Sequence, residues 1–277
     1  MILYPEMLSS RLPLRVAIPA LSIALAFPCP LVSQAARVDL RGEFDRLGVP
    51  IHQQGQRGAC QVFAMVTVAE YLLARHGHPV QLSEQFLMWA ANQANGLHRS
   101  DGFNPDLLIK GWRAYGIAAD RLMPYVPRNE PIAAPSPAAL ADAATRRTIA
   151  LTSIKHWTEP IGLTDLQIQA IMARLAAGIP VTVTLCWPFG LTDSQIVDAN
   201  YFLIDRNING NDKSGHGVVI VGYQMDTRVP GGGFLIVRNS WGTAFGDKGH
   251  LNVSLALARK YGIDAYVVDP TARPIGY

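Results

Sequence analysis

The segment QGQRGACQVFA, residues 54–64, leads from a glycine-rich turn into a long apolar helix and decides the fold of this chain. Apolar residues recur at helical spacing from Val62 to Leu73 and Gly77 ends the pattern, which predicts a buried helix with one apolar stripe. Cys60 opens this helix, so its sulfur is expected at the positive end of the helix dipole, where a thiolate is favoured. A lone cysteine at such a position is more often an inert core residue, so the rest of the chain must decide.

Two further helices are expected in the first half of the chain. Ser83 is an N-cap for a helix that extends to about Asn92. Asn104 followed by Pro105 combines an N-cap with a first-turn proline and begins a helix that ends at Gly116. This half is therefore expected to be helical.

The second half of the chain has a different hydrophobic pattern, with short apolar runs in place of helical spacing. Residues 133–145 are rich in Ala, Pro and Ser and are interpreted as an exposed connector. Thr164 and Gln167 form a capping box for a helix that ends at Gly178. Short apolar runs then predict strands, and the three glycines at 231–233 predict a hairpin turn. The predicted strands cover residues 181–185, 218–224, 234–237, 250–255 and 265–268.

Three blocks give Cys60 possible chemical partners. Segment 54–64 resembles the active-site segment of papain-like cysteine peptidases, in which a glutamine six residues before the nucleophile is an oxyanion donor, and Gln54 has that spacing. The segment GHG at 215–217 is similar to that around the family's catalytic histidine, and VRNSWGT at 237–243 to that around its catalytic asparagine. Because the blocks follow the family's order across residues 50–270, the resemblance is specific.

The resemblance implies an α+β, papain-like two-lobed fold. A helical N-terminal lobe, residues 36–150, would carry Cys60, and an antiparallel β-rich C-terminal lobe, residues 151–277, would carry His216 and Asn239. The active site would lie in the cleft between the lobes.

The resemblance also implies contacts with the substrate. Gly102 is the expected equivalent of the glycine that pairs with an extended peptide, and Gly215 and Trp241 are expected to line the same cleft. Trp241 would in addition cover the bond between His216 and Asn239 from water.

These residue types are those of a thiol-dependent peptide hydrolase, here expected to be an endopeptidase. His216 would take the proton of Cys60, Asn239 would orient the imidazole, and the thiolate would form a thioester with the peptide. Gln54 and the N–H of Cys60 would bind the oxyanion. Each residue alone has an ordinary structural explanation. The same triad also suits an acyltransferase or transglutaminase, and the fold suits a non-catalytic peptide-binding module, so both alternatives stay open.

Two positions depart from the family. Arg57 stands where relatives usually have a disulfide-forming cysteine, and Gln61 stands where they have an aromatic residue after the nucleophile. Both are expected to alter the floor of the cleft, so the natural substrate and its subsite preferences stay open. The stretch between a signal peptide and Cys60 is short for the family's helical propeptide, and a separate protein inhibitor is one expected partner.

The first 35 residues have the pattern of an export signal. Arg11 and Arg15 precede an apolar run at 16–27, and small residues at 33–35 offer a cleavage site. We therefore expect residues 1–35 to be a signal peptide and the protein to be secreted or periplasmic. The alternative is a membrane anchor, for which the run is shorter than the roughly 20 residues needed and contains Pro19.

Composition narrows the remaining functions. The formal net charge is +3 and the basic residues form no run, so the partner is expected to be a polypeptide rather than nucleic acid. His76 and His78 lack a second pair of ligands, so we expect neither a metal nor an organic cofactor. Cys186 ends an apolar strand and is interpreted as a buried thiol, and no disulfide framework is expected.

Overall fold

The computed structural model of the protein describes residues 35–99, 101–187, 202–203 and 215–271. The predicted signal peptide, residues 1–35, lies outside the described residues except for its last position. Within those ranges, none of the helices combines the length and the apolar character that a membrane span requires.

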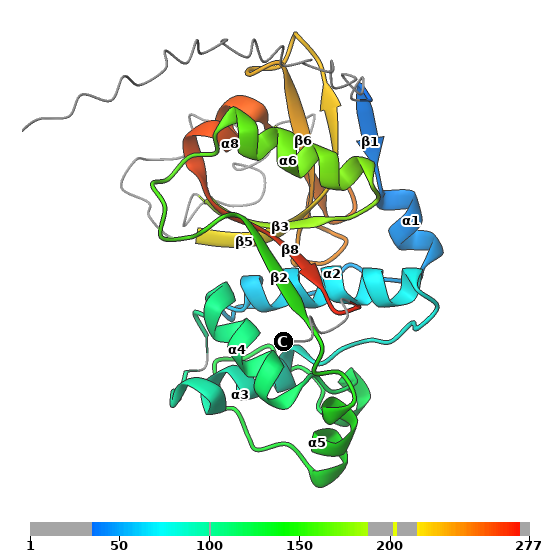
Figure 1. The fold of residues 1–277 in the computed structure, drawn as a ribbon, viewed down its shortest axis with the longest axis vertical. Coiled ribbons are helices and arrows are strands. Elements are labelled where there is room, and N and C mark those ends of the chain that lie inside the picture. The colour runs from blue at the N-terminus through cyan, green and yellow to red at the C-terminus, as the bar shows by residue number, and fades with distance from the viewer. Residues whose placement is uncertain (1–34, 100, 188–201, 204–214, 272–277) are drawn as a thin grey trace, which may run out of the picture. The chain divides into compact units, whose positions relative to one another are not determined.

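Helix α2, Cys60–Arg75, is the central element of the fold. Figure 1 shows it running between the strands on one side and helices α3, Glu84–Asn95, and α4, Pro105–Tyr115, on the other. All residues from Gln61 to Leu72 are buried, so the helix is covered on every side rather than along the single predicted stripe. A helix placed between two layers must be apolar around most of its circumference. The predicted start at Cys60 is confirmed.

The helices of the first half begin where their capping residues predict. Ser83 accepts a hydrogen bond from the N–H of Phe86 at the start of α3, and Asn104 accepts one from the N–H of Leu107 at the start of α4. Helix α4 ends before Gly116, as predicted, whereas α3 extends beyond Asn92 to Asn95. Three short elements accompany them: β1, Arg37–Asp39, α1, Arg41–Arg46, and η1, Asp120–Leu122.

The segment predicted as an exposed connector, residues 133–145, instead contains helix α5, Pro137–Ala144. Ser136 caps it by accepting the N–H of Ala139, and a proline followed by alanines suits a first helical turn. Ala139 is fully buried in a small second core with Phe86, Ala90, Ala118 and Ala143. The prediction was wrong because alanine and proline are common in connectors, whereas a serine followed by proline also starts a helix.

The second half forms the sheet. In the described residues its strands have the order β2-β8-β3-β5-β6-β7-β4, and β1 pairs with β5 at the side of this path. The pairs are antiparallel apart from β4 with β7, which are parallel. The strands are β2 Ala150–Lys155, β3 Val181–Cys186, β4 Phe202–Leu203, β5 Gly215–Met225, β6 Gly233–Arg238, β7 His250–Ser254 and β8 Gly262–Asp269.

The five predicted strands are confirmed as β3, β5, β6, β7 and β8. The hairpin at 231–233 is also confirmed, since β5 and β6 pair across it. Helix α6, Asp165–Ala176, has the predicted capping box. Strand β7 stops at Ser254, one residue short of the prediction, because the Ser254 side chain accepts the N–H of Leu257 and caps helix α8, Leu255–Tyr261.

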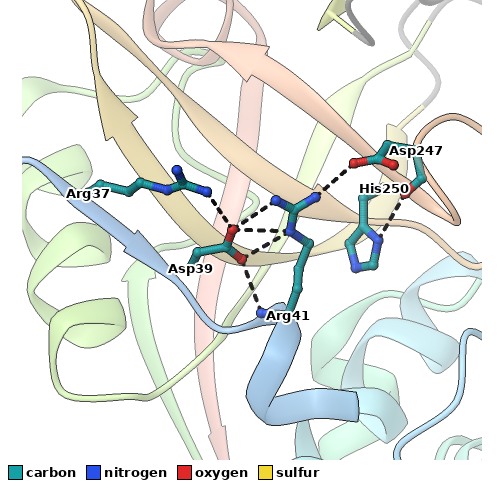
Figure 2. Close-up of polar contacts among 5 residues, drawn as sticks. All are labelled: Arg37, Asp39, Arg41, Asp247 and His250. Carbon is teal, nitrogen blue, oxygen red and sulfur yellow. Dashed lines mark hydrogen bonds and ion pairs between the residues drawn. The ribbon is translucent and has the colours of Figure 1, made fainter.

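Arg41 ties the start of the described chain to the turn before β7 (Figure 2). Its guanidinium lies 2.8 Å from Asp39 Oδ2 and 2.9 Å from Asp247 Oδ2, and Arg37 lies 3.0 Å from the same Asp39 oxygen. Burial raises the pKa of Asp39, but the hydrogen bonds from Arg41 and Arg37 outweigh it and hold that pKa at about 2. The network therefore links the segment before α1 to this turn.

Candidate active site

Cys60 lies at the first turn of α2, at the wall of a cavity of about 550 Å³. The helix has Ala59 as its N-cap, which provides no side-chain acceptor, so the backbone N–H groups of the first turn are not capped by that residue. Cys60 is partly buried and forms no disulfide. The sulfur thus borders a space that a ligand can enter, as the sequence predicts.

Strand β5 approaches this turn very closely through Gly217. A Cβ atom added at Gly217 would lie 2.3 Å from Gln61 Oε1 and 2.9 Å from Gln61 N, so only glycine allows this contact. The backbone N–H of Gly217 also interacts with the sulfur of Cys60 and favours its ionised form. The close approach brings the neighbouring residue, His216, to the same end of α2.

His216 is held by Asn239. Its Nε2 lies 2.8 Å from Asn239 Oδ1, and both side chains are buried, at 5% and 3% exposure. The same Asn239 oxygen accepts the N–H of Ser240 at 2.8 Å, which identifies it as an oxygen and makes His216 Nε2 the donor. His216 Nδ1 is therefore left without the proton and can receive one.

The turn after β6 fixes Asn239 from the other side. The backbone N–H of Asn239 donates to the carbonyl of Gly249 at 2.9 Å. Gly249 lies in the same turn as Asp247, which the Arg41 guanidinium contacts. The position of Asn239 is thus set by both backbone and side-chain contacts.

Two tryptophans enclose the imidazole of His216. Trp241 has its ring centroid 4.7 Å away and Trp187 4.8 Å away, and Trp241 also contacts Phe245 at 5.0 Å. Trp241 covers the imidazole as expected. Trp187 was not predicted, because only the pairing of β3 with β5 places the residue after Cys186 beside His216.

Burial acts on the two titratable groups in opposite directions. It raises the pKa of the Cys60 thiol, and the N–H groups of Gly217, Gln61 and Cys60 offset this only in part. It lowers the pKa of His216 to about 4, although the hydrogen bond with Asn239 raises it. Each group taken singly is therefore neutral at pH 7, so a thiolate at Cys60 depends on proton transfer to His216, as the sequence predicts. An ion pair requires that the two charges stabilise each other.

Gln54 has its side chain fixed next to Cys60. Its Nε2 donates to the carbonyl of Arg57 at 2.9 Å, and its Oε1 accepts the hydroxyl of Ser240 at 2.6 Å. An amide nitrogen carries two hydrogens, so one remains for another acceptor. Gln54 and Cys60 line the same cavity, as the resemblance predicts.

The expected substrate contacts lie at this cavity as well. Gly102, Gly215 and Trp241 all line it. The N–H of Gly102 donates to the carbonyl of Gly58 at 2.8 Å, and its carbonyl accepts Arg99 Nη1 at 2.9 Å. Pairing of Gly102 with a peptide, which would need these groups, stays a prediction.

Arg57 links three segments beneath the site. Its side chain is 1% exposed, and it donates to Gln85 Oε1 at 3.1 Å, to the carbonyl of Val126 at 3.0 Å and to that of Glu130 at 3.3 Å. A hydrogen-bonded cation therefore stands where the family resemblance leads one to expect a disulfide. The sequence alone shows that Arg57 replaces the cysteine usual in the family, but it does not show which acceptors Arg57 binds.

Gln61 forms part of a polar floor with Thr184 and Asp264. Gln61 Nε2 donates to Thr184 Oγ1 at 2.9 Å, and Asp264 Oδ1 accepts the N–H of Thr184 at 2.9 Å. Burial raises the pKa of Asp264 to about 6. The expected alteration of the cleft floor relative to the family stays a prediction, and Thr184 and Asp264 are residues that the sequence alone did not single out.

No group of three or more His, Cys, Asp or Glu side chains in the described ranges is arranged to hold a metal ion. The free thiol at Cys186 is buried at the end of β3. Of the two thiols in the described ranges, Cys60 is the one that lines the cavity.

Curated relatives are similar in sequence over most of this chain. Vignain from Vigna mungo is 27% identical over 218 residues, which cover 77% of this chain and 53% of vignain. Cathepsin S from Mus musculus is 25% identical over 225 residues, which cover 79% of this chain and 59% of the relative. The chain thus spans little more than half the length of these relatives.

The structural neighbours have the same fold. Xylellain, a cysteine protease from Xylella fastidiosa, superposes with a TM-score of 0.64 at 19% identity, covering 87% of this chain and 88% of xylellain. Digestive procathepsin L 3 of the Tenebrio molitor larval midgut gives 0.59 at 21% identity, covering 85% and 70%. The predicted papain-like two-lobed α+β fold is confirmed. Because the model of the papain family of cysteine proteases also matches residues 35–271, this chain belongs to that family.

Proposed function

We propose that the protein is a cysteine peptidase in which Cys60, His216 and Asn239 act together. The observation that carries the proposal is the bond of 2.8 Å between His216 and Asn239 beside Gly217, whose backbone contacts the Cys60 sulfur. This arrangement leaves His216 Nδ1 as a proton acceptor, in the residue that directly precedes the glycine contacting the thiol. A buried, singly neutral pair becomes reactive when the proton moves from sulfur to nitrogen.

The proposed reaction has two stages. The proton of Cys60 moves to His216, and the sulfur bonds to the carbonyl carbon of the peptide, whose oxygen becomes an oxyanion. The second amide hydrogen of Gln54 and the N–H of Cys60 donate to that oxyanion, each contact being worth roughly 3 kcal/mol. His216 returns the proton to the leaving amine, and the C–N bond breaks to give a thioester. Water, deprotonated by His216, then releases the acid and restores the thiol.

The proposal extends to the lobes of the protein, its substrate contacts, its location and its control. Residues 36–150 and 151–277 are proposed as the two lobes, with Gly102, Gly215 and Trp241 contacting an extended polypeptide. Cleavage inside a chain and control by a separate protein inhibitor are proposed from the resemblance. Secretion or a periplasmic location is proposed from the export-signal pattern of residues 1–35. They concern the whole protein, whose curated relatives are longer than this chain.

Covalent labelling tests the proposal. We expect an epoxysuccinyl reagent to add once to the protein at neutral pH, at Cys60 as located by peptide mass mapping. His216→Ala should suppress labelling and hydrolysis of fluorescein-labelled casein, whereas Cys186→Ser should leave both unchanged because that thiol is buried away from the cavity. Labelling that survives in His216→Ala would contradict the proposed pair.

Product analysis decides between the remaining functions. With added glycine ethyl ester, a peptidase gives mainly free acids from casein, whereas an acyltransferase gives amides of the added amine. A protein that binds casein without either product, and without labelling, is a peptide-binding module. Either result would contradict the peptidase proposal.

A further inference from the structure

A buried group of titratable side chains lies beneath the segment that carries Gln54. His52 Nε2 is 2.8 Å from Glu70 Oε2, and His52 Nδ1 is 3.5 Å from Glu84 Oε1. The side chains of His52, Glu70 and Glu84 are 15%, 2% and 4% exposed. Glu70 belongs to α2 and Glu84 begins α3, so this His52 cluster connects the segment before Cys60 to two helices.

The cluster has more negative than positive groups at its centre. Glu70 has its second oxygen bonded to the N–H of Leu82 at 2.8 Å, while Glu84 Oε1 has no hydrogen-bond donor among the described residues. The other charges that reach the cluster are Arg238 of β6 and Asp120 of η1. Two buried carboxylates facing one imidazole cannot both ionise cheaply unless that imidazole is charged.

The titration of the cluster follows from this geometry. Burial lowers the pKa of His52, but the hydrogen bond and charge of Glu70 and the charge of Glu84 outweigh it, and the net direction is upward. Burial raises the pKa of Glu84 to about 8. The geometry therefore favours the imidazolium form of His52 beside Glu70, while burial keeps the proton on Glu84 up to about pH 8.

Backbone contacts connect this cluster to the proposed oxyanion donor. The carbonyl of His52 accepts the N–H of Gly242 at 2.9 Å, and the N–H of Gln54 donates to the carbonyl of Ser240 at 2.8 Å. Gln53, between them, forms a bridge with Trp241. The side chain of His52 therefore anchors one end of a three-residue segment that is attached along its length to the residues after Asn239.

We propose that protonated His52 is a positioning residue for Gln54. The imidazolium, hydrogen-bonded to Glu70 and packed against Glu84, fixes segment 52–54 so that the Gln54 amide faces the oxyanion, and loss of that proton at alkaline pH loosens the segment. The inference rests on the proposed peptidase function. It adds a second histidine to the site, one that acts on oxyanion binding and leaves the thiol unaffected.

The rates of hydrolysis and of thiol alkylation distinguish an effect on oxyanion binding from an effect on the Cys60 thiol. Hydrolysis of a peptidyl aminomethylcoumarin, chosen from the casein cleavage sites, needs the oxyanion donor, whereas alkylation of Cys60 by iodoacetamide forms no oxyanion. From about pH 6 to about pH 9 we expect the ratio of kcat/KM to the alkylation rate to fall about tenfold, part of the roughly 10²–10³-fold that loss of a whole oxyanion donor costs. His52→Lys keeps a cation through this range and should hold the ratio constant.

Further variants distinguish positioning from general support of the fold. His52→Gln should lower the ratio about tenfold even at about pH 6, while thermal unfolding shows that the protein is folded. The control His78→Lys changes an exposed histidine and should follow the unmodified protein. A ratio that falls as steeply in His52→Lys as in the unmodified protein, or a His52→Gln variant that loses alkylation and hydrolysis equally, would overturn the proposal.

Failure of the proposed function gives a different result. If Cys60 is alkylated but no variant hydrolyses the substrate, the peptidase proposal is wrong. NMR titration of the His52 imidazole then decides the cluster by itself: a pKa above about 6.5 supports the anchored imidazolium, and a lower value overturns it.

Discussion

His216 and His52 lie in two regions of the molecule that bury an imidazole with opposite results. His216 has an uncharged amide as its partner, and burial lowers its pKa to about 4. His52 has two carboxylates as partners, and although burial again lowers its pKa, the carboxylates turn the net direction upward. The difference teaches that the partner, rather than the depth of burial, decides in which direction the pKa of a buried histidine moves. A neutral histidine can accept a proton from Cys60, whereas a charged one can serve as an anchor.

The largest expected effect comes from removing the amide partner of His216. Asn239→Ala should lower kcat/KM roughly 10²- to 10⁴-fold, because the imidazole loses the bond that fixes its orientation and tautomer. The alkaline limb of Cys60 alkylation should move to lower pH, since the Asn239 hydrogen bond raises the pKa of His216. Stopped-flow alkylation across pH measures the shift, with Asn129→Ala, an exposed asparagine, as the matched control. An unchanged alkaline limb would separate Asn239 from the titration of His216.

Arg57 is a third buried group for this comparison, a cation that donates hydrogen bonds to uncharged oxygens. Arg57→Met should lower the free energy of unfolding by about 2–4 kcal/mol, because three buried acceptors lose their donor. Urea unfolding measures the change, and Arg128→Met, whose side chain is 81% exposed, is the control. Equal midpoints for the two variants would show that the Arg57 contacts do not stabilise the fold.

The dependence of stability on pH sharpens the comparison between the two regions. Glu84 binds its proton more tightly in the folded state, with a pKa of about 8 against 4.5, so its contribution to stability is lost as pH rises from about 4.5 to about 8. His216 acts in the opposite direction, since its folded pKa of about 4 lies below 6.5 and stability is lost as pH falls through that range.

Glu84→Gln isolates the first of these effects. The variant should gain stability relative to the unmodified protein as pH rises from about 5 to about 8, by at most about 1.4 kcal/mol per pH unit. Urea unfolding at a series of pH values measures the difference, and Glu130→Gln, at an exposed position, is the control. A flat difference for Glu84→Gln would mean that Glu84 ionises normally in the folded protein.

The smallest effect is expected at the network of Figure 2. Arg41→Ala should lower the free energy of unfolding by less than about 1 kcal/mol, because the Arg41 side chain is 31% exposed and water screens its charge. The loss should shrink further at high salt. A larger loss, with lower activity, would show that the turn holding Asn239 depends on this network.

Much of the fold could be predicted because its signals are local. Ser83, Asn104 and Thr164 cap helices where the sequence places them, and the glycines at 231–233 form the hairpin turn. Helix α5 was missed although its signal is also local, since Ser136 and the proline after it were not weighed as a cap. The predicted burial of α2 is confirmed, although periodicity cannot show that a second layer also covers the side opposite the apolar stripe.

The sequence by itself determined Cys60 at a helix start, together with Gln54, His216 and Asn239 in an order similar to that of papain-like peptidases. These features lie in short contiguous segments, so they can be read without knowing the fold. Only the tertiary structure decided that Trp187 covers His216, that Asp264 lies under the cleft and that His52 meets two carboxylates. Such contacts join residues far apart in the chain, and the charge of each buried group depends on those partners.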